Sequence, residues 1–349
     1  MSQLVDHLAE LTGFRDRDVL DVTLVGALRD LLRPQEVAIY RAVGEPGSQF
    51  WMTRARLRAD DTAPHADPLW AEPGSLPPLD SAPQRLACLQ CQHAVQHHGE
   101  WACAWFPVAN DQYSVQVLEL HTERPLDAEA LRTVSSVLRI YRNFQDLLDY
   151  TERDTLTGLL NRKTFDERFM RMASVGQEPA AAPLATPAPG VPELRRLAPA
   201  GRMWLAVIDI DHFKRVNDVY GHLIGDEVLL LLSRLMRSTF RFHDHLYRFG
   251  GEEFVVLMRC DDVEAATSAL QRLRQVVAGY RFPQVERITV SVGFTALRAS
   301  DTPSGAFERA DLALYHIKQN GRDGVACHAE LVAQGHLQDR ERDNDVELF

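Results

Sequence analysis

Hydrophobic positions in the first third of the chain switch between helical and strand-like spacing. In residues 18–32 apolar side chains recur every three or four positions, which predicts a helix, and residues 37–40 form an apolar run typical of a strand. Residues 101–107 and 113–120 alternate with the period of two expected of strands joined by a turn. This order of elements predicts an α/β domain over residues 1–125.

A long helix is predicted over residues 126–153, because no Gly or Pro interrupts the chain there. Two stripes with alternating spacings of three and four run along it. One stripe could pack on the first domain and the other on a second copy of the chain. The alternative is a single amphipathic helix buried on its own domain, since seams this short are weak evidence for a coiled coil. The first stripe is Leu131, Val134, Leu138, Tyr141, Gln145 and Leu148, and the second is Val137, Ile140, Phe144 and Leu147.

Two acidic motifs follow apolar runs in the second half of the chain. Residues 203–208 read as a buried strand that ends at Asp209, and Gly250 and Gly251 form a tight turn between apolar runs, directly ahead of Glu252 and Glu253. Buried carboxylates are costly unless a cation compensates them. If the two strands are neighbours, Asp209 and Glu252 offer hard oxygen ligands for Mg²⁺ or Mn²⁺. An acidic surface turn without a metal is the alternative.

Composition narrows the class of protein. A length of 349 residues suits two domains, and the formal charge of −11 disfavours nucleic acid as a partner. The sequence lacks an apolar stretch long enough to span a membrane and a signal-peptide pattern, so a soluble cytoplasmic protein is expected. Five cysteines, an odd number, predict reduced thiols.

Residues 154–326 resemble the GGDEF domain, the catalytic domain of diguanylate cyclases. The resemblance places the Ala- and Pro-rich run at residues 174–200, which has the composition of a linker, inside a catalytic domain at 154–328 as an insertion, ahead of a polar tail at 329–349. Four motifs in order carry the resemblance: Asp154-Thr155-Leu156-Thr157-Gly158-Leu159-Leu160-Asn161-Arg162, Asp209-Ile210-Asp211-His212-Phe213-Lys214, Gly250-Gly251-Glu252-Glu253-Phe254 and Tyr315-His316-Ile317-Lys318-Gln319-Asn320-Gly321-Arg322.

This resemblance implies a fold, an activity and a metal site. It implies an α/β (α+β) chain whose catalytic domain is palm-like, with a central, mainly antiparallel sheet. The implied reaction joins two GTP molecules into cyclic di-GMP and releases two pyrophosphates at a homodimer interface, with two Mg²⁺ or Mn²⁺ ions per active site. The metal ligands fall on Asp209, the backbone carbonyl of Ile210, and Glu252. Glu253 is implied to help activate the ribose 3′-hydroxyl, so the catalytic residues are Glu253, Glu252 and Asp209.

The resemblance also assigns the substrate contacts. Guanine selection falls on Asn217 and Asp226, because a carboxylate can accept from two guanine N–H groups and an amide can donate and accept. By themselves these residues read as a helix-end signal and an exposed helix residue. The bare backbone of Gly250 and Gly251 lets substrate approach. Phosphate contacts fall on Lys214, Lys318 and Arg322, the last two one helical turn apart and able to point the same way; a solvated basic face is the alternative.

Arg241 and Asp244 stand at the position of the family's RxxD product-binding site, which implies inhibition by cyclic di-GMP. A surface ion pair of little consequence is the alternative, and Arg272 is a candidate for a second arginine at this site. Two rival functions stay open: a receptor that binds cyclic di-GMP without catalysis, and a cyclase that makes another nucleotide.

By size, element order and position, residues 1–125 resemble GAF-type sensory domains, which implies an unknown small-molecule or other signal. The segment also contains Cys88, Cys91, His93 and Cys103, which could form a zinc site or a redox switch. Buried thiols beside a polar loop are the alternative.

Overall fold

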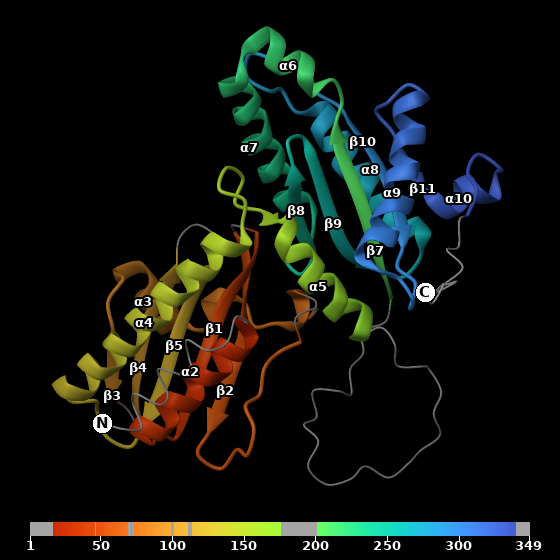
Figure 1. The fold of residues 1–349 in the computed structure, drawn as a ribbon. Coiled ribbons are helices and arrows are strands. Elements are labelled where there is room, and N and C mark those ends of the chain that lie inside the picture. The colour runs from red at the N-terminus through yellow and green to blue at the C-terminus, as the bar shows by residue number, and fades with distance from the viewer. Residues whose placement is uncertain are drawn as a thin grey trace, which may run out of the picture. The chain divides into compact units, whose positions relative to one another are not determined.

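The computed structural model describes residues 17–45, 47–68, 71, 73–98, 101–110, 114–175 and 201–339. They fall into two compact units that divide between Thr151 and Glu152, and each unit has its own sheet (Figure 1). We call residues 17–151 the first unit and residues 152–339 the second unit. The predicted insertion at 174–200 lies, from residue 176 onward, outside the described residues.

The first unit contains a five-stranded antiparallel sheet in the order β2-β1-β5-β4-β3. All four pairings between neighbouring strands are antiparallel. The predicted strand at 37–40 is the middle of a longer one. The strands are β1 (Glu36–Glu45), β2 (Ser48–Arg58), β3 (Val95–His98), β4 (Ala102–Asn110) and β5 (Ser114–Thr122).

Helices cover both faces of this sheet. α2 (Arg17–Leu32) and α4 (Ala128–Glu152) pack on one face, where Leu24, Ile39 and Phe106 are completely or nearly buried. α3 (Pro83–Cys91) and the short helix η2 (Leu79–Ser81) belong to the other face, and the short helix η1 (Pro73–Ser75) lies in the connection from β2 to η2. The resemblance of this unit to GAF-type domains stays a prediction.

The long helix α4 belongs to the core of the first unit. Five residues of its first predicted stripe, from Val134 to Leu148, are buried, as is Val137 of the second stripe. By contrast, Leu147 is 55% exposed. The expectation that the first stripe packs on the first domain is confirmed, because this amphipathic face is buried on the sheet of the first unit. Its use in a dimer stays a prediction.

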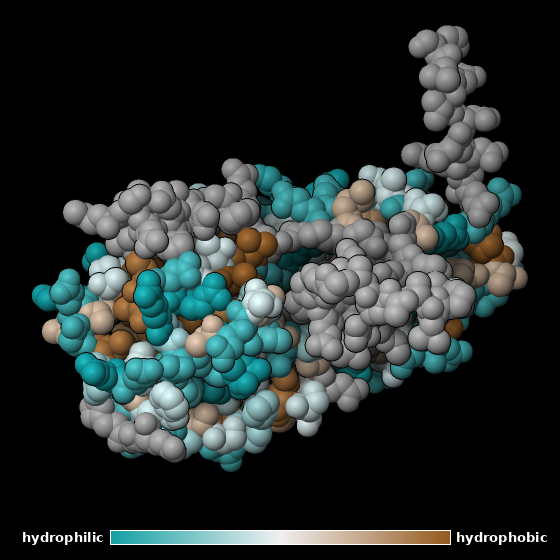
Figure 2. Space-filling view, turned by 90° about the horizontal axis from the view of Figure 1, so that it is seen from below, coloured by the Kyte–Doolittle hydropathy of each residue, from teal (hydrophilic) through white to brown (hydrophobic). Residues whose placement is uncertain are grey.

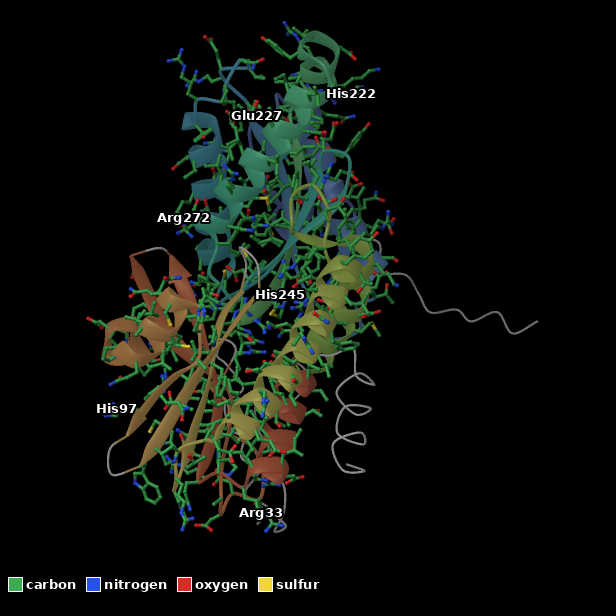
Figure 3. All side chains as sticks on the ribbon, turned by 90° about the vertical axis from the view of Figure 1, so that its left-hand side faces the viewer. Arg33, His97, His222, Glu227, His245 and Arg272 are labelled. Carbon is green, nitrogen blue, oxygen red and sulfur yellow. The ribbon has the colours of Figure 1, made fainter. Side chains whose placement is uncertain are left out.

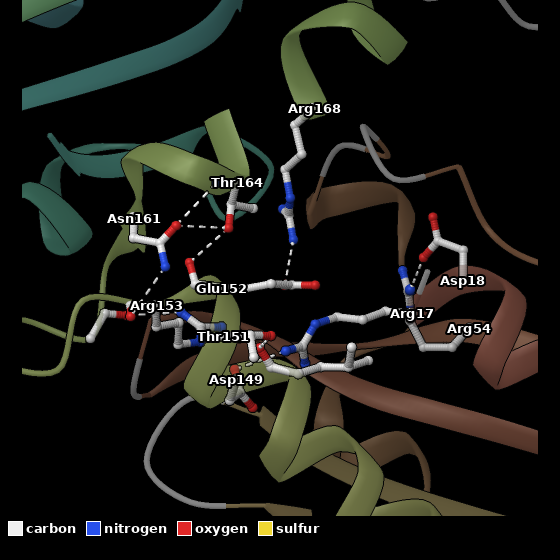
Figure 4. A network of polar contacts seen from close by, with 12 residues as sticks. Arg17, Asp18, Arg54, Asp149, Thr151, Glu152, Arg153, Asn161, Thr164 and Arg168 are labelled. Atoms are coloured by element: carbon white, nitrogen blue, oxygen red, sulfur yellow. Dashed lines mark hydrogen bonds and ion pairs between the residues drawn. The ribbon is translucent and has the colours of Figure 1, made fainter. Parts of the chain in front are cut away.

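Polar contacts fasten α4 inside the first unit. The buried hydroxyl of Tyr141 donates to Asp21 of α2, and Gln145 Nε2 donates to the Tyr141 hydroxyl at 2.7 Å. Burial raises the pKa of Asp21, and the charge of Arg54, 3.0 Å away, opposes that rise. Near the end of α4, Arg17 Nη2 donates to Asp149 at 2.9 Å (Figure 4). These contacts explain why Gln145 is tolerated in an otherwise apolar stripe.

The second unit contains a six-stranded sheet in the order β11-β10-β7-β9-β8-β6. The central pairings β10–β7, β7–β9 and β9–β8 are antiparallel, and the outer pairings β6–β8 and β10–β11 are parallel. The expected mainly antiparallel central sheet is confirmed. Its strands are β6 (Leu160–Asn161), β7 (Arg202–Ile210), β8 (His245–Gly250), β9 (Glu253–Cys260), β10 (Val290–Ala296) and β11 (Val325–Cys327).

Alternation along β7 sends its side chains to two separate helix layers. Ile208 packs in the core with α6 (Phe213–Tyr220), α7 (His222–Thr239) and α8 (Val263–Gly279). Val207 packs in the core with α5 (Arg162–Val175) and α9 (Pro303–Gln319). Because side chains of a strand alternate between its faces, Asp209 lies on the same side as α9.

The helix α9 approaches the sheet most closely at Gly293 of β10. A Cβ atom added there would lie 2.1 Å from the Ala310 carbonyl oxygen and 2.2 Å from the Leu314 nitrogen. We expect Gly293→Ala to destabilise the protein by about 3 kcal/mol, because the backbone of α9 would have to move away. Urea unfolding measures this change. Gly279→Ala is the control, since a Cβ there meets no described atom within 4 Å; equal stability of the two variants would contradict the prediction.

The segment after β11 is more ordered than the sequence indicates. A polar tail is predicted from residue 329, but residues 329–333 belong to the helix α10 (His328–Ala333). Leu331 of this helix is only 7% exposed. Arg298 Nη2 donates to Asp339 at 2.7 Å. The prediction is wrong for residues 329–339, because one apolar residue per turn suffices to dock a short helix.

The surface is mainly hydrophilic on the face drawn in Figure 2, with small hydrophobic patches between polar residues. Across residues 17–339, apart from the gaps given above, no helix is long and apolar enough to cross a membrane.

Candidate active site

Two acidic motifs meet at one edge of the second sheet. The antiparallel register of β7 and β9 pairs Asp209 with Glu253. The β8–β9 hairpin closes with Gly250 opposite Glu253, so Glu252 lies in the turn directly beside this pair. The expectation that the two strands are neighbours is therefore confirmed.

Negative charge is concentrated at this edge. Burial raises the pKa of Asp209, while Lys318, whose Nζ lies 2.8 Å from Asp209 Oδ2, opposes the rise. Burial also raises the pKa of Glu252 and of Glu253, and in both cases the charge of Asp209 is the next cause. Asp311 of α9 adds to the same field, since its charge raises the pKa of Asp209 and of Glu253. Lys318 therefore pairs with Asp209 at an edge where several carboxyl groups raise one another's pKa.

This donor set fits a divalent cation. Carboxylate and carbonyl oxygens are the ligands of Mg²⁺ and Mn²⁺, and the excess negative charge would be compensated by such an ion. Asp209 and Glu252 offer two side chains and Ile210 offers a backbone carbonyl, with substrate phosphates to complete the shell. Among the described residues no group of three or more His, Cys, Asp or Glu side chains is gathered for a metal, which is compatible with a site of two such side chains.

The turn between β8 and β9 presents bare backbone. A Cβ atom on Gly250 or Gly251 would meet no described atom within 4 Å, and Gly251 has a φ of +39°. Arg248 holds the turn, because its Nη2 donates to the Gly251 carbonyl at 2.9 Å. Its Nη1 donates to Asp154 Oδ1 at 3.0 Å. The sequence alone assigns no role to Arg248 or to the carboxylate of Asp154. Asp154 is the first residue of the opening motif, and Arg248 lies two residues before Gly250.

Asp154 in turn organises the opening motif. Its Oδ1 accepts from the Thr157 backbone N–H at 2.8 Å and from the Thr157 hydroxyl at 2.7 Å. Burial tends to raise the pKa of Asp154, but the Thr157 and Arg248 hydrogen bonds outweigh burial and lower it. Glu152 accepts from the Thr164 hydroxyl at 3.0 Å through its carbonyl and pairs with Arg168 at 3.2 Å (Figure 4). Through Asp154 and Arg248, the opening motif is therefore hydrogen-bonded to the turn between β8 and β9.

A second buried carboxylate, Asp211, fixes the loop that follows α9. It accepts from the Thr289 hydroxyl at 2.6 Å, the Ser291 hydroxyl at 2.7 Å and the Asp323 backbone N–H at 3.0 Å. Sequence reasoning missed this role, because the partners lie 78 to 112 residues away.

The two basic residues of the closing motif do not share a helix face. Lys318 is in the last turn of α9 and reaches Asp209, but α9 ends at Gln319 and Arg322 lies in the following loop with a φ of 65°. The prediction that they are one helical turn apart is wrong, because Asn320 caps the helix and Gly321 has a φ of 111°. The Arg322 side chain is exposed, as is Lys214 in the first turn of α6.

The two predicted guanine contacts come together where α6 packs against α7. Asn217 of α6 is half-buried, and its Oδ1 lies 1.9 Å from the point that a Cβ on Gly225 would occupy. Gly225 directly precedes Asp226, which is exposed in the second turn of α7. The amide of Asn217 therefore packs on the backbone beside Asp226.

The predicted product site is a tight turn ahead of β8. Asp244 Oδ2 accepts from the backbone N–H of Arg241 at 2.9 Å, so the carboxylate closes the turn rather than forming a surface ion pair. The Asp244 side chain is only 6% exposed, and burial raises its pKa to about 6. Arg272 on α8 (Figure 3) donates to the Thr239 carbonyl at 3.0 Å. Its positive charge lowers the pKa of Asp244 and so opposes the effect of burial. The turn therefore has two arginines beside a buried carboxylate.

The cysteine and histidine cluster does not form a metal site within the described residues. Cys88 is buried and burial raises its pKa to about 12, whereas Cys91 is exposed. Both thiols point to the His93 carbonyl oxygen, at 3.5 and 3.4 Å. Cys103 lies on β4 opposite His97 of the edge strand β3 (Figure 3). Of the two readings left open by the sequence, this arrangement of Cys88 and Cys91 favours a buried thiol beside a polar loop.

Comparison with known proteins finds a similarity in the second half of the chain. Residues 193–324 match the family model described as "Diguanylate cyclase, GGDEF domain". The chain is similar to diguanylate cyclase DgcP of Pseudomonas aeruginosa, with 42% identity over 173 residues, which is 49% of this chain and 23% of DgcP. It is similar to diguanylate cyclase DgcM of Escherichia coli K12, with 36% identity over 49% of this chain and 37% of DgcM.

Two further proteins are similar to part of the chain. Diguanylate cyclase DgcZ of Escherichia coli K12 is 33% identical over 56% of this chain and 59% of DgcZ. The solved structure of the coiled coil and GGDEF domain of DgcB from Caulobacter crescentus, in complex with c-di-GMP, is 26% identical with a TM-score of 0.47 and covers 57% of this chain and 97% of that one. The chain thus spans between 23% and 59% of these three curated relatives.

Proposed function

We propose that this chain, whose second unit contains a GGDEF domain, is a diguanylate cyclase that joins two GTP molecules into cyclic di-GMP and two pyrophosphates. One observation carries the proposal: the sheet register sets Asp209 opposite Glu253, with Lys318 bound to Asp209, beside the open backbone of Gly250 and Gly251. This combination suits a nucleoside triphosphate with its metal ions: the carboxylates can hold the ions, Lys318 can contact phosphate, and the glycine backbone leaves room for the substrate.

The acidic residues divide two roles between them. Asp209, the Ile210 carbonyl and Glu252 would hold Mg²⁺ or Mn²⁺. When bound, two such ions lower the pKa of the attacking hydroxyl and neutralise charge on the departing pyrophosphate. Glu253 is the residue we assign to accept the proton of the ribose 3′-hydroxyl, because its raised pKa brings a carboxylate base closer to neutral pH.

Substrate binding follows from the surrounding side chains. Asp226 would accept from the two guanine N–H donors and Asn217 would both donate and accept, a pattern that adenine cannot match. Lys318, Arg322 and Lys214 supply positive charge for the phosphates. Arg322 would bind from its loop, whose place is fixed through Asp323 and Asp211.

The reaction needs two catalytic domains, because each is assigned one GTP and supplies a 3′-hydroxyl to the α-phosphate of the other. We therefore propose a homodimer. The first unit, in the role of a GAF-like sensor, and α4 would set how the two domains meet.

Product inhibition is proposed at Arg241 and Asp244, with Arg272 as the second arginine. A guanidinium can bind phosphate through two N–H groups and stack on guanine, and the Asp244 carboxylate can accept from guanine N–H. The same turn would serve the receptor function if catalysis were absent.

A product assay tests the proposal. The purified full chain is incubated with Mg²⁺ or Mn²⁺ and either GTP or ATP, and products are identified by mass spectrometry. Cyclic di-GMP from GTP alone supports the cyclase. No product, with cyclic di-GMP binding retained, supports the receptor instead, and a product from ATP supports the other cyclase.

Gly225→Ala is expected to raise KM for GTP by about tenfold with little effect on folding. The added Cβ would take the position of the Asn217 amide, 1.9 Å away, and turn it from the guanine site. Loss of one hydrogen-bond pair to the base costs about 1.4 kcal/mol. Steady-state kinetics of this variant and of the Gly279→Ala control measure the effect. An unchanged KM in a folded protein would remove Asn217 from the guanine site.

A further inference from the structure

The sheet face under α3 in the first unit carries a group of polar side chains that the proposed cyclase reaction does not use. The register places Arg56 of β2 beside Ala38 of β1, and Ala38 beside Glu119 of β5. Tyr40 is two residues further along β1 and shares this face with Trp105. Because Ala38 has only a Cβ, the polar ends of its neighbours can lie over it.

Arg85 of α3 is held on this face by two contacts. Its guanidinium carbon lies 3.3 Å from the centroid of the Tyr40 ring, and its Nε donates to Glu119 Oε2 at 2.6 Å. Glu119 also accepts from Trp105 Nε1 at 2.9 Å and contacts His121 Nε2 at 2.7 Å. Although burial opposes it, hydrogen bonds from His121 and Arg85 lower the pKa of Glu119 to about 2. Glu119 is therefore ionised, and both of its carboxylate oxygens have hydrogen-bond partners.

The outer edge of the Arg85 fork is unused. Within the described part of the chain, neither Nη1 nor Nη2 has a hydrogen-bond acceptor. A guanidinium that is fixed through its face and its Nε loses little freedom when its two terminal N–H groups bind a ligand.

Arg56 differs from its neighbours on β2. Arg54 pairs with Asp21 at 3.0 Å, and Arg58 pairs with Glu36 at 2.8 Å. Arg56 Nε is buried and has no hydrogen-bond partner among residues 17–339 outside the gaps. A buried donor of a charged group that stays unpaired destabilises the folded state, so a ligand that accepts from it would be favoured.

The Tyr40 ring lies under the Arg85 guanidinium, and Tyr40 is two residues along β1 from Ala38, which pairs with Arg56. Burial raises the pKa of Tyr40 and the charges of Glu119 and Glu36 add to the rise, whereas the charges of Arg85 and Arg56 oppose it. In the part of the chain that the structure describes, no group hydrogen-bonds with the hydroxyl, although the residue is only 8% exposed. His121 Nε2 lies 2.7 Å from Glu119 Oε1, and this hydrogen bond raises the pKa of His121.

We propose that Arg56, Arg85 and the Tyr40 hydroxyl form a binding site for the oxyanion group of a small molecule, a carboxylate or a phosphate. Two guanidinium groups and a hydroxyl offer more N–H and O–H donors than this face can satisfy. A planar or tetrahedral oxyanion accepts such donors in pairs. The neighbouring carboxylate of Glu119 does not repel the ligand strongly, because it is paired with Arg85 at 2.6 Å.

Ligand binding to the full chain tests this site. The probes are inorganic phosphate and benzoate, with benzamide as the neutral analogue of benzoate and sodium chloride to hold ionic strength constant. Calorimetry gives the affinity, and the thermal unfolding midpoint gives a second readout because a ligand of the folded state raises it. The variants are Arg56→Gln and Tyr40→Phe, neither of which breaks a described side-chain hydrogen bond. Arg58→Gln, two residues along the same strand, is the matched control.

Wild type is expected to bind phosphate, benzoate or both, and not benzamide. The affinity should fall by about tenfold or more in Arg56→Gln and in Tyr40→Phe, and stay unchanged in Arg58→Gln. Binding of neither anion by wild type, or an equal loss in Arg58→Gln, would overturn the site. The result is independent of the cyclase proposal, since no GTP is present and no residue of the second unit is changed.

Discussion

Asp209→Asn is expected to lower the rate of cyclic di-GMP formation by about a thousandfold or more. The amide keeps the size of the carboxylate but not its charge, so the proposed metal ion would lose a ligand. Lys318 would also lose the partner that holds its Nζ at 2.8 Å. Because Asp209 carries a raised pKa, its charge is not a large source of stability, and the variant should stay folded.

The rate is measured with GTP and Mg²⁺ by following pyrophosphate release, and folding is checked by thermal unfolding. Asp218→Asn is the matched control, since Asp218 is an exposed acid on α6. A folded Asp209→Asn enzyme that retains more than about a tenth of the wild-type rate would exclude Asp209 from the metal site and, with it, the assignment of the acidic edge.

The pairing of the two acidic motifs could be predicted because it depends on short-range patterns. The apolar run before Asp209 and the paired glycines before Glu252 each specify a local element, and antiparallel pairing of the two strands then brings the carboxylates together. By the same logic, the amphipathic pattern of residues 18–32 predicts α2 to within one residue.

Contacts that close over long sequence distances could not be predicted. Arg248 and Asp154 are 94 residues apart, and the sequence around each residue does not indicate that Arg248 donates a hydrogen bond to Asp154. Asp211 reads as part of a metal motif until Thr289 and Ser291 are seen to saturate it. Arg322 differs, because a local signal is present: Asn320 and Gly321 end α9 directly after Gln319, so the spacing of four from Lys318 does not place Arg322 on the helix.

Asp244→Asn is expected to weaken product inhibition by about a hundredfold and, unusually for a change in a binding site, to stabilise the protein at neutral pH. The pKa of Asp244 is about 6 against its usual 3.8, because the carboxyl is buried. A raised folded-state pKa means that its contribution is complete below pH 3.8 and is lost as the pH rises through about 6. Asparagine removes this loss, which is about 3 kcal/mol at most, and its amide oxygen can still accept from the Arg241 N–H.

Two measurements check this prediction. The unfolding midpoint of Asp244→Asn at neutral pH should exceed that of wild type by about 5 °C, and the difference should vanish as the pH falls below about 4. Inhibition by cyclic di-GMP, scored against each variant's own uninhibited rate, should weaken by about a hundredfold. In wild type, inhibition should also weaken as the pH falls through about 6, since a protonated Asp244 cannot accept from both guanine donors.

Arg241→Ala separates the two effects, because it removes the exposed guanidinium and leaves the buried carboxyl in place. It should lose inhibition and gain no stability. If Asp244→Asn were stabilised but inhibited like wild type, the strained carboxylate would be a feature of the turn alone and the product site would lie elsewhere. If inhibition were lost without stabilisation, the Asp244 charge would be better solvated than its 6% exposure indicates. The buried charge of Asp244 therefore destabilises the fold at neutral pH, and in the proposed product site the same charge accepts from the guanine N–H groups.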